Sequence, residues 1–293
     1  MPVYPFVTLD VFTQQRFGGN PLAVFTDATG LSAAQMQDLA REMNLSETTF
    51  VLPPADPAHT ARVRIFNPVA EMAFAGHPTV GTGYVLAQRG GEGVLTLEAP
   101  AGVVEVRVER DASGVPVGAV IDAPRPLSLG LELDPALMAA CASLAASDIV
   151  LSAHRPVEAS VGMGFVMAEV TPAALSSASP DLAAFRLAAK DLPNAAERLS
   201  LHLYARDGDV IRARMFAPLS GVIEDPATGS ANAALAALLL SMTADQDAAY
   251  TVVQGVEMGR PSHLRLTARR EADGVHASVG GGCVPVFRGE ALV

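Results

Sequence analysis

An internal repeat is the feature that most constrains what this chain can fold into. Residues 64–83, RIFNPVAEMAFAGHPTVGTG, are echoed by residues 214–231, RMFAPLSGVIEDPATGSA. The offset between the copies is 150 positions at the leading arginine and 153 at the glycine before the helical run. So constant an offset indicates a duplicated module with a three-residue loop insertion in the second copy. We therefore expect one supersecondary unit to be built twice.

Each copy places a small polar doublet where a helix is expected to begin. A strand-like Arg-x-Phe-x-Pro segment is followed by a loop that ends in Gly76-His77 or Gly229-Ser230, and then by an apolar run. Backbone amides and the helix dipole favour negative charge at a helix N-terminus. We therefore expect both doublets to bind an anion, and to share one ligand.

The segments after the doublets indicate sheets. Residues 99–124 and 252–281 alternate in polarity, with turn-forming residues at 111–114 and 271–274, as in hairpins of half-buried strands. The helix expected at 231–240 is apolar all round, and such a helix must be buried all round. The predicted fold class is α+β, in which each half is a curved, mostly antiparallel sheet wrapped around a buried central helix.

The chain is long enough for two domains. It has 293 residues, half of them hydrophobic, which suffices for two cores of ordinary size. The repeat predicts two pseudo-symmetric domains, 1–122 and 128–280, with a last strand at 283–293 that packs back on the first domain.

Charge and apolar segments exclude several classes of partner. The net charge of −11 and the pI near 4.9 oppose binding to nucleic acid or to an anionic membrane, which depends on basic patches. The N-terminus lacks the pattern of a secretory signal, and the longest apolar run, Ala233 to Leu240, is too short to span a membrane. The sequence thus predicts a cytoplasmic protein that binds neither nucleic acid nor membrane.

Motifs for metals, nucleotides and reactive thiols are missing from the sequence. The six histidines are scattered without zinc-ligand spacing, so we expect no metal. Gly76 to Gly81 has the spacing of a phosphate loop, but Thr82 stands where lysine is required. Cys141 and Cys283 have no Cys-x-x-Cys partner and are predicted to be buried thiols.

The N-terminal region predicts a carboxylate at an element junction. Strands are expected at 3–12 and 22–26, and a helix capped by Ser32 is expected to end at Asn44. A β-branched strand follows, with Glu47 at the junction. Catalytic side chains often project from such junctions, although a surface carboxylate at a strand end fits the same pattern.

Five ordered blocks resemble one known family. They are GGNPLAVF (18–25), REMNLSETTFV (41–51), RIFNPVAEMAFAGHPTVGTGYVL (64–86), EDPATGSAN (224–232) and QGVEMGRPS (254–262). Together they resemble the PhzF-like phenazine-biosynthesis isomerases, which share the duplicated diaminopimelate-epimerase-like fold. The resemblance covers essentially the whole chain. It implies an isomerase without a cofactor, a site between two pseudo-symmetric domains, and a homodimer.

The resemblance also implies site residues. The family's catalytic glutamate, histidine, aspartate and serine correspond here to Glu47, His77, Asp225 and Ser230. The amides at Gly76 and Gly229 would then hold the carboxylate of a small anionic substrate. Asn20, in the Gly-Gly-Asn-Pro turn, is a further candidate for substrate binding, with a structural turn role as the alternative.

Elementary chemistry supports a carboxylate such as Glu47 as the catalytic base. Moving a proton between carbons needs a base whose conjugate acid returns the proton elsewhere, and burial makes a carboxylate more basic.

Each candidate site residue also has a structural alternative. His77-Pro78 and Asp225-Pro226 both suit the start of a helix, and Ser230 suits close packing.

Two rival functions remain open from the sequence. One is an amino-acid racemase or epimerase of related fold. Relatives of that kind carry a cysteine in each doublet region, where this chain has His77 and Ser230. The other is a non-catalytic protein that binds a small molecule in the same place. The intact set of candidate catalytic residues argues against it.

Overall fold

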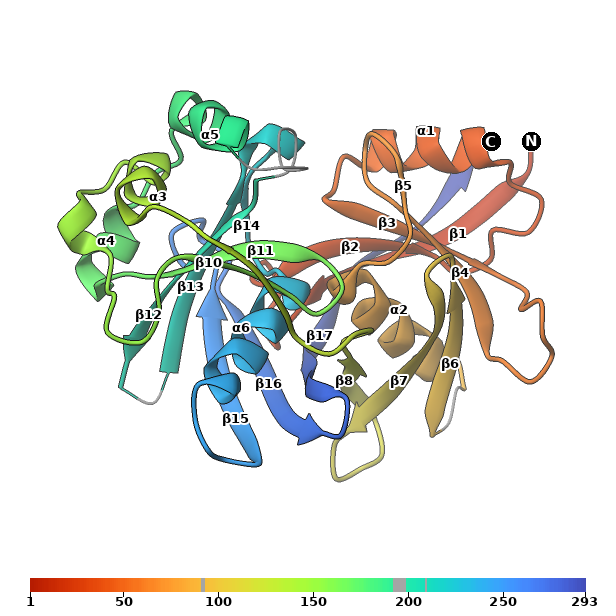
Figure 1. Ribbon diagram of the computed structural model, residues 1–293. Helices are drawn as coiled ribbons and strands as arrows, with labels where there is room; N and C mark the ends of the chain where they lie inside the picture. Colours follow the sequence, from red (N-terminus) through yellow and green to blue (C-terminus); the bar gives the residue numbers. More distant parts are fainter. Residues whose placement is uncertain (91–92, 192–198, 209) are drawn as a thin grey trace. The chain divides into compact units, whose positions relative to one another are not determined.

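The computed structural model describes residues 1–90, 93–191, 199–208 and 210–293 (Figure 1). The chain divides into two compact units, each described here by itself. Unit 1 comprises Met1–Asp122 and Val279–Val293, and unit 2 comprises Ala123–Ser278. Strands dominate both units, and helices are few.

Unit 1 holds both chain termini. Its first strand pairs with the last strand of the chain in antiparallel register, from Val3 opposite Leu292 to Val11 opposite Cys283. The elements of unit 1 are β1 (Val3–Val11), β2 (Asn20–Phe25), α1 (Ala33–Met43), β3 (Glu47–Leu52), β4 (Ala61–Phe66), β5 (Glu71–Met72), α2 (Gly76–Gln88), β6 (Val94–Ala99), β7 (Gly102–Arg110), β8 (Pro116–Asp122) and the later part of β17 (Gly274–Leu292).

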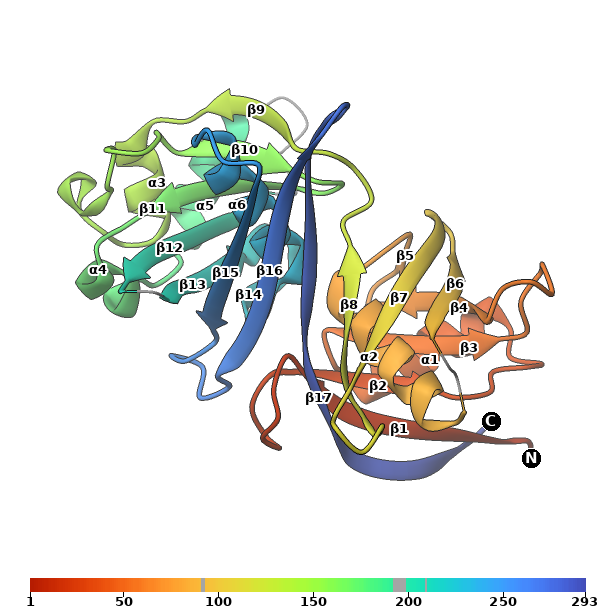
Figure 2. The same cartoon turned by 90° about the horizontal axis from the view of Figure 1, so that it is seen from below.

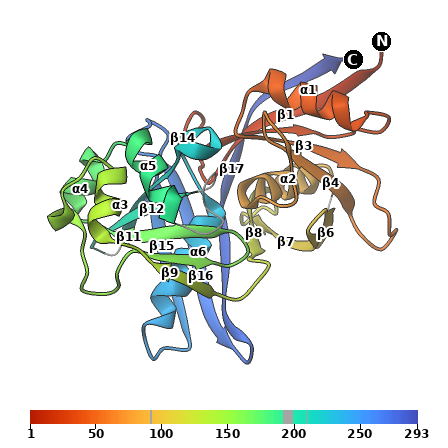
Figure 3. The same cartoon turned by 45° about the horizontal axis from the view of Figure 1, so that its top comes forward.

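The short helices α3, α4 and α5 of unit 2 lie together in Figures 1 and 3. Its elements are β9 (Ser128–Glu132), α3 (Pro135–Cys141), β10 (Val157–Ser160), β11 (Gly164–Glu169), α4 (Pro172–Ser177), α5 (Leu182–Ala188), β12 (Leu201–Asp207), β13 (Val210–Ala217), β14 (Val222–Asp225), α6 (Gly229–Ser241), β15 (Asp247–Gln254), β16 (Ser262–Glu271) and the start of β17, with 3-10 turns at Ala146–Asp148, Ala189–Asp191 and Pro218–Ser220.

Strand pairing repeats between the units. In unit 1, β1–β2 is antiparallel, β2–β3 parallel, β3–β4 antiparallel, β4–β6 parallel and β6–β7 antiparallel. In unit 2, the ladders β10–β11, β11–β12, β12–β13, β13–β15 and β15–β16 follow the same series of directions. The echo in the sequence is therefore part of a longer structural repeat.

Local signals in the sequence set helix α1. The predicted cap at Ser32 and the predicted end at Asn44 are both confirmed: Ser32 forms a capping box with Gln35, and Asn44 is in the left-handed conformation. The helix buries Met36 and Ala40 against an aromatic cluster. Within that cluster Phe25 and Phe50 stack at 4.8 Å between ring centroids.

Helices α2 and α6 are the most buried elements. All but two residues of α6 are buried, and the helix packs against β10, β11, β15 and β16. Helix α2 packs against β1, β2, β3, β7 and β8 (Figure 2). In α2, a Cβ on Gly83 would lie 2.4 Å from Val106 Cγ1, and one on Gly81 would lie 2.6 Å from Leu22 Cδ2. These glycines let the strands approach the helix closely.

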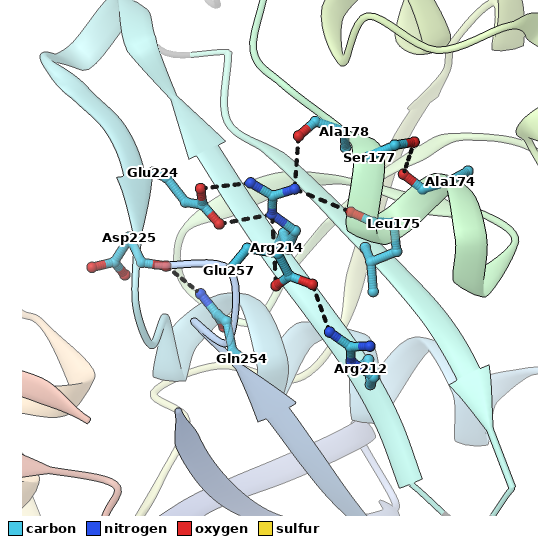
Figure 4. Close-up of polar contacts among 10 residues, drawn as sticks. All are labelled: Ala174, Leu175, Ser177, Ala178, Arg212, Arg214, Glu224, Asp225, Gln254 and Glu257. Atoms are coloured by element: carbon cyan, nitrogen blue, oxygen red, sulfur yellow. Dashed lines mark hydrogen bonds and ion pairs between the residues drawn. The ribbon is translucent and has the colours of Figure 1, made fainter. Parts of the chain in front are cut away.

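An arginine–glutamate pair is repeated with the duplication. Arg64 donates from Nε and Nη2 to the two oxygens of Glu71, at 2.7 and 2.6 Å, and Arg214 binds Glu224 in the same way at 2.8 Å for both contacts (Figure 4). Each guanidinium also lies over a phenylalanine two residues further on, at 5.1 and 4.9 Å from the ring centroid. Bidentate pairs of this kind fix geometry as well as charge.

The paired glutamates occupy equivalent places in the two copies. Glu71 precedes the first residue of α2 by five positions, and Glu224 precedes the first residue of α6 by five. The three extra residues of the second copy therefore lie between Arg214 and Glu224, where the 3-10 turn Pro218–Ser220 is found. The pair anchors the segment that leads into each helix.

The close approach at Gly83 generates a stability prediction. Gly83→Ala should lower the free energy of unfolding by about 1–3 kcal/mol, because the added methyl group overpacks against Val106. Helix propensity alone predicts the opposite sign, about 1 kcal/mol in favour of alanine. Urea denaturation measures the difference.

A second substitution provides the control for that experiment. Val106→Ala removes the methyl group that the new Cβ would meet. The double variant Gly83→Ala/Val106→Ala should therefore be more stable than the sum of the single effects predicts. Additive effects would contradict the packing explanation.

Candidate active site

Glu47 and His77 lie together in unit 1. Glu47 opens β3, and His77 is the second residue of α2. Nδ1 of His77 lies 3.3 Å from Oε2 of Glu47, and the two side chains are 5% and 15% exposed. The turn after α1 and the loop after β5 thus bring a carboxylate and an imidazole together from separate segments of the chain.

Burial keeps the His77 ring neutral. Loss of hydration lowers the pKa of His77 to about 3, and a hydrogen bond to the Pro21 carbonyl acts in the opposite direction. At neutral pH the contact with Glu47 therefore joins a carboxyl group to an uncharged ring and is no ion pair. Nε2 of the ring is buried and has no hydrogen-bond partner among the described residues, an arrangement that costs about 1–3 kcal/mol until a partner is supplied.

The start of β2 lies beside this pair. Leu22 is opposite Glu47 in the parallel ladder between β2 and β3. Asn20 is fully buried, and its Oδ1 accepts a hydrogen bond of 2.9 Å from Ser46 Oγ. The start of β2, with Asn20, thus lies along the start of β3, with Ser46 and Glu47.

The amides at the start of α2 are not capped by a side chain. The N-cap residue is Ala75, which has no acceptor in its side chain. Pro78 has no N–H, so the first-turn donors are those of Gly76 and His77. The structural alternative for His77, a helix cap, is wrong because the N-cap residue is Ala75 and His77 is the second residue of the helix.

The second doublet belongs to a polar network in unit 2. Asp225 is the last residue of β14, and its Oδ2 accepts a hydrogen bond of 2.5 Å from Thr228 Oγ1. Thr228 is the N-cap residue of α6, yet its side chain does not cap the helix. The reading of Asp225-Pro226 as N-cap and first helical residue is therefore wrong. Ser230 lies in the first turn of α6 and is half-buried.

Known proteins resemble this chain over nearly its whole length. The profile described as phenazine biosynthesis-like protein (PhzC-PhzF) matches residues 9–289. The chain belongs to this family. It is 38% identical to the trans-2,3-dihydro-3-hydroxyanthranilate isomerase of Pseudomonas aeruginosa over 94% of each chain. The chain is accordingly an isomerase, as the resemblance implied.

Solved structures support the fold. A PhzF-family protein of Bacillus anthracis matches with a TM-score of 0.89 and 26% identity, over the whole of both chains. A hydroxyproline epimerase of Agrobacterium vitis matches with a TM-score of 0.66 and 14% identity, over 98% of this chain and 92% of that one. The second likeness shows the fold alone, which is epimerase-like as predicted.

Sequence reasoning missed some members of the unit 2 network in this PhzF-family chain. Thr228, Asn232 and Gln254 join Asp225 through hydrogen bonds. Gln254 opens the QGVEMGRPS block, so the block was recognised while the role of its first residue was not. A glutamine at a strand end has no distinctive pattern, and its contacts come from segments 22 to 29 positions away.

The cysteines and one further group of polar side chains complete the description of candidate reactive residues. Both cysteines are buried, as predicted, and burial raises the pKa of Cys141 to about 12. Within the described ranges, one group of three side chains has the spacing of metal ligands, Glu271, Asp273 and His276 at the turn between β16 and β17. No helix of the described residues has the length and apolar character needed to cross a bilayer.

The buried ring generates a prediction about pH. His77 should stay neutral down to about pH 4, because its pKa is near 3 in the folded chain and near 6.5 when unfolded. The unfolded chain then binds one more proton between these values, so the ring lowers the stability of the fold as the pH falls from about 6.5 to 3. NMR titration of the ring, assigned with His77→Asn, measures this. A midpoint above about 5 would contradict it.

Proposed function

We propose that this isomerase moves a proton on a small carboxylate substrate without a cofactor, with Glu47 as the general acid and base. The observation that carries the proposal is the contact between Glu47 and the buried, neutral ring of His77 at the uncapped start of α2. General acid–base catalysis needs a carboxyl group that is held in place within reach of the reacting proton, and Glu47 is held largely buried beside an uncharged ring.

The proposed step conserves atoms and electrons. The Glu47 carboxylate removes a proton from a substrate carbon, and the electron pair of that C–H bond enters a conjugated enolate or dienolate. The protonated Glu47 then returns the proton to a different carbon, and the double bond moves accordingly. No oxidation takes place.

Fixed donors stabilise the charge that develops. The amides of Gly76 and His77 are oriented by α2, which favours the substrate carboxylate there. His77 Nε2, buried without a partner among the described residues, supplies a further polar contact to the substrate. Asn20, held by Ser46, is proposed to contact the substrate beside Glu47.

Unit 2 supplies the second group of proposed site residues. Asp225 and Ser230 precede and begin α6, and the amides at Gly229 and Ser230 are proposed to bind anionic substrate groups. That both doublets act on one ligand stays a prediction from the repeat. The homodimer and the cytoplasmic location expected from the sequence also stay predictions.

Glu47→Gln tests the proposed base directly. The substitution keeps the size and shape of the side chain and removes the basic carboxylate, so turnover should fall by at least roughly a hundredfold. The test substrate is trans-2,3-dihydro-3-hydroxyanthranilate, which is named in the activity of the Pseudomonas aeruginosa relative. Proton NMR in D2O follows both the product and the deuterium incorporated at the new C–H bond.

Two controls accompany the Glu47 experiment. Circular dichroism and the thermal midpoint of Glu47→Gln should remain near those of the wild-type chain. Glu42→Gln, on the exposed end of α1, changes the same charge without touching the site and should leave turnover unaltered. Turnover near the wild-type value in Glu47→Gln would refute the proposed mechanism. Binding of the substrate without turnover in the wild-type chain would favour the non-catalytic alternative.

Removing or modifying the two cysteines distinguishes the proposed mechanism from that of a two-thiol racemase. Cys141→Ser with Cys283→Ala should retain activity apart from a cost in stability, because the thiols lie on α3 and β17 and neither is near a doublet in the sequence. Iodoacetamide should not inactivate the native enzyme, since it attacks the thiolate and burial disfavours that form. Rapid inactivation that the substrate prevents would favour the racemase.

A further inference from the structure

Gln254 is fully buried at the end of β15, and all its hydrogen-bonding capacity is used on one short segment. Nε2 donates to the Asp225 carbonyl at 2.7 Å and to Thr228 Oγ1 at 3.2 Å (Figure 4 shows the first contact). Oε1 accepts from the Thr228 amide at 3.2 Å and from Asn232 Nδ2 at 2.7 Å. A primary amide offers two donors and two acceptor sites, so the group is saturated.

These contacts set the direction of the hydrogen bond to Asp225. Thr228 Oγ1 accepts a hydrogen bond from Gln254 Nε2, so its own hydroxyl proton points at Asp225 Oδ2, 2.5 Å away. Rotating the Gln254 amide by 180° would place its NH2 group against the Thr228 N–H and the Asn232 NH2, with donor facing donor. The network therefore fixes both the amide and the acceptor role of that carboxylate oxygen.

In this arrangement the N-terminus of helix α6 has no side-chain cap. A threonine at the N-cap usually accepts from an amide of the first turn, which is worth about 1 kcal/mol. Here the Thr228 side chain makes no such bond and serves Asp225 instead. Helix α6 therefore lacks the stabilisation of a side-chain cap, and the same hydroxyl instead fixes the position of the Asp225 carboxylate.

The duplicated unit provides an internal comparison. Helices α2 and α6 begin at Gly76 and Gly229, so Asp225 and Thr228 correspond to Met72 and Ala75. In the parallel ladders, Arg62 is opposite Glu98 and Arg212 is opposite Val253, which matches Gln254 with Ala99. All three polar positions of unit 2 are apolar in unit 1.

The apolar residues of unit 1 show that the fold does not require these three polar side chains. Unit 1 forms the same ladders and an equally long helix with methionine and alanine at these positions. The polar trio is therefore not needed to build the supersecondary unit. Because Thr228 and Gln254 both bind Asp225, which is proposed for the site, their role is best explained through that residue.

We infer that Gln254 and Thr228 are positioning residues that hold the Asp225 carboxylate in its working orientation. The inference rests on the proposed function, in which Asp225 is one of the site residues. Gln254 fixes the backbone at Asp225 and orients the Thr228 hydroxyl, and that hydroxyl fixes the carboxylate. Neither residue is assigned a contact with the substrate.

A pair of substitutions at Thr228 tests the hydroxyl. Thr228→Val keeps the shape and removes the hydrogen bond, and kcat should fall roughly tenfold to a hundredfold, the scale of a misplaced catalytic group. KM should change by less than about threefold, because binding groups are untouched. Thr228→Ser keeps the hydroxyl and should restore most of kcat. Equal losses in both variants, or an effect on KM alone, would overturn the inference.

A matched control addresses general effects of losing a hydroxyl. Thr267 in β16 makes a hydrogen bond of 2.6 Å with Ser278, away from this network. Thr267→Val should leave kcat and KM unchanged. If it lowers kcat as Thr228→Val does, the loss is structural and the inference fails.

Amide hydrogen exchange gives a readout that does not need turnover. The Thr228 amide is held by Gln254 Oε1. Gln254→Met should raise its exchange rate at least roughly tenfold, whereas Gln254→Glu keeps an acceptor there and should raise it less. Unchanged exchange in Gln254→Met would overturn the positioning role. A wild-type chain without turnover would instead refute the proposed function, and the exchange result would still decide whether Gln254 holds this segment.

Discussion

Burial of two helices without a polar face is the constraint on which the rest of this structure depends. Eleven of the thirteen residues in each of α2 and α6 are buried, so neither helix has a face that is left to water. Strands must therefore surround much of each helix, and glycine must replace larger residues where a strand passes closest, as at Gly81 and Gly83. Their N-termini are the places where these buried helices offer polar groups that they do not use themselves.

The segments that lead into the helices are fixed by charge. In each unit a bidentate arginine–glutamate pair holds the chain five residues before the helix starts, and a phenylalanine lies beneath the guanidinium. In unit 2 the same arginine also donates to the carbonyls of Leu175 and Ala178, so Arg214 ties α4 to the sheet as well. The anchor is common to both copies, whereas the polar residues that follow it differ.

In the proposed mechanism, that difference gives the two copies of the unit different chemical roles. Unit 1 joins Glu47 to a neutral, buried His77, an arrangement suited to moving a proton. Unit 2 has a saturated amide network around Asp225, an arrangement suited to holding one carboxylate still. Isomerisation by proton transfer needs both a group that changes protonation and groups that do not move, because fixed dipoles stabilise charge without reorganisation. The duplication kept the framework and allowed its side chains to diverge.

The sequence by itself determined the family, the repeat, and the elements with strong local signals. The Ser32 cap, the Asn44 end of α1, the two apolar helices and the hairpin turns follow from short-range chemistry, which acts within a few residues. It also named Glu47, His77, Asp225 and Ser230, through ordered blocks that resemble a known family. Only the tertiary structure decided that His77 is neutral, that Thr228 serves Asp225 in place of its own helix, and that Gln254 holds both. Those properties depend on burial and on partners distant in the chain, and neither is encoded in a local pattern.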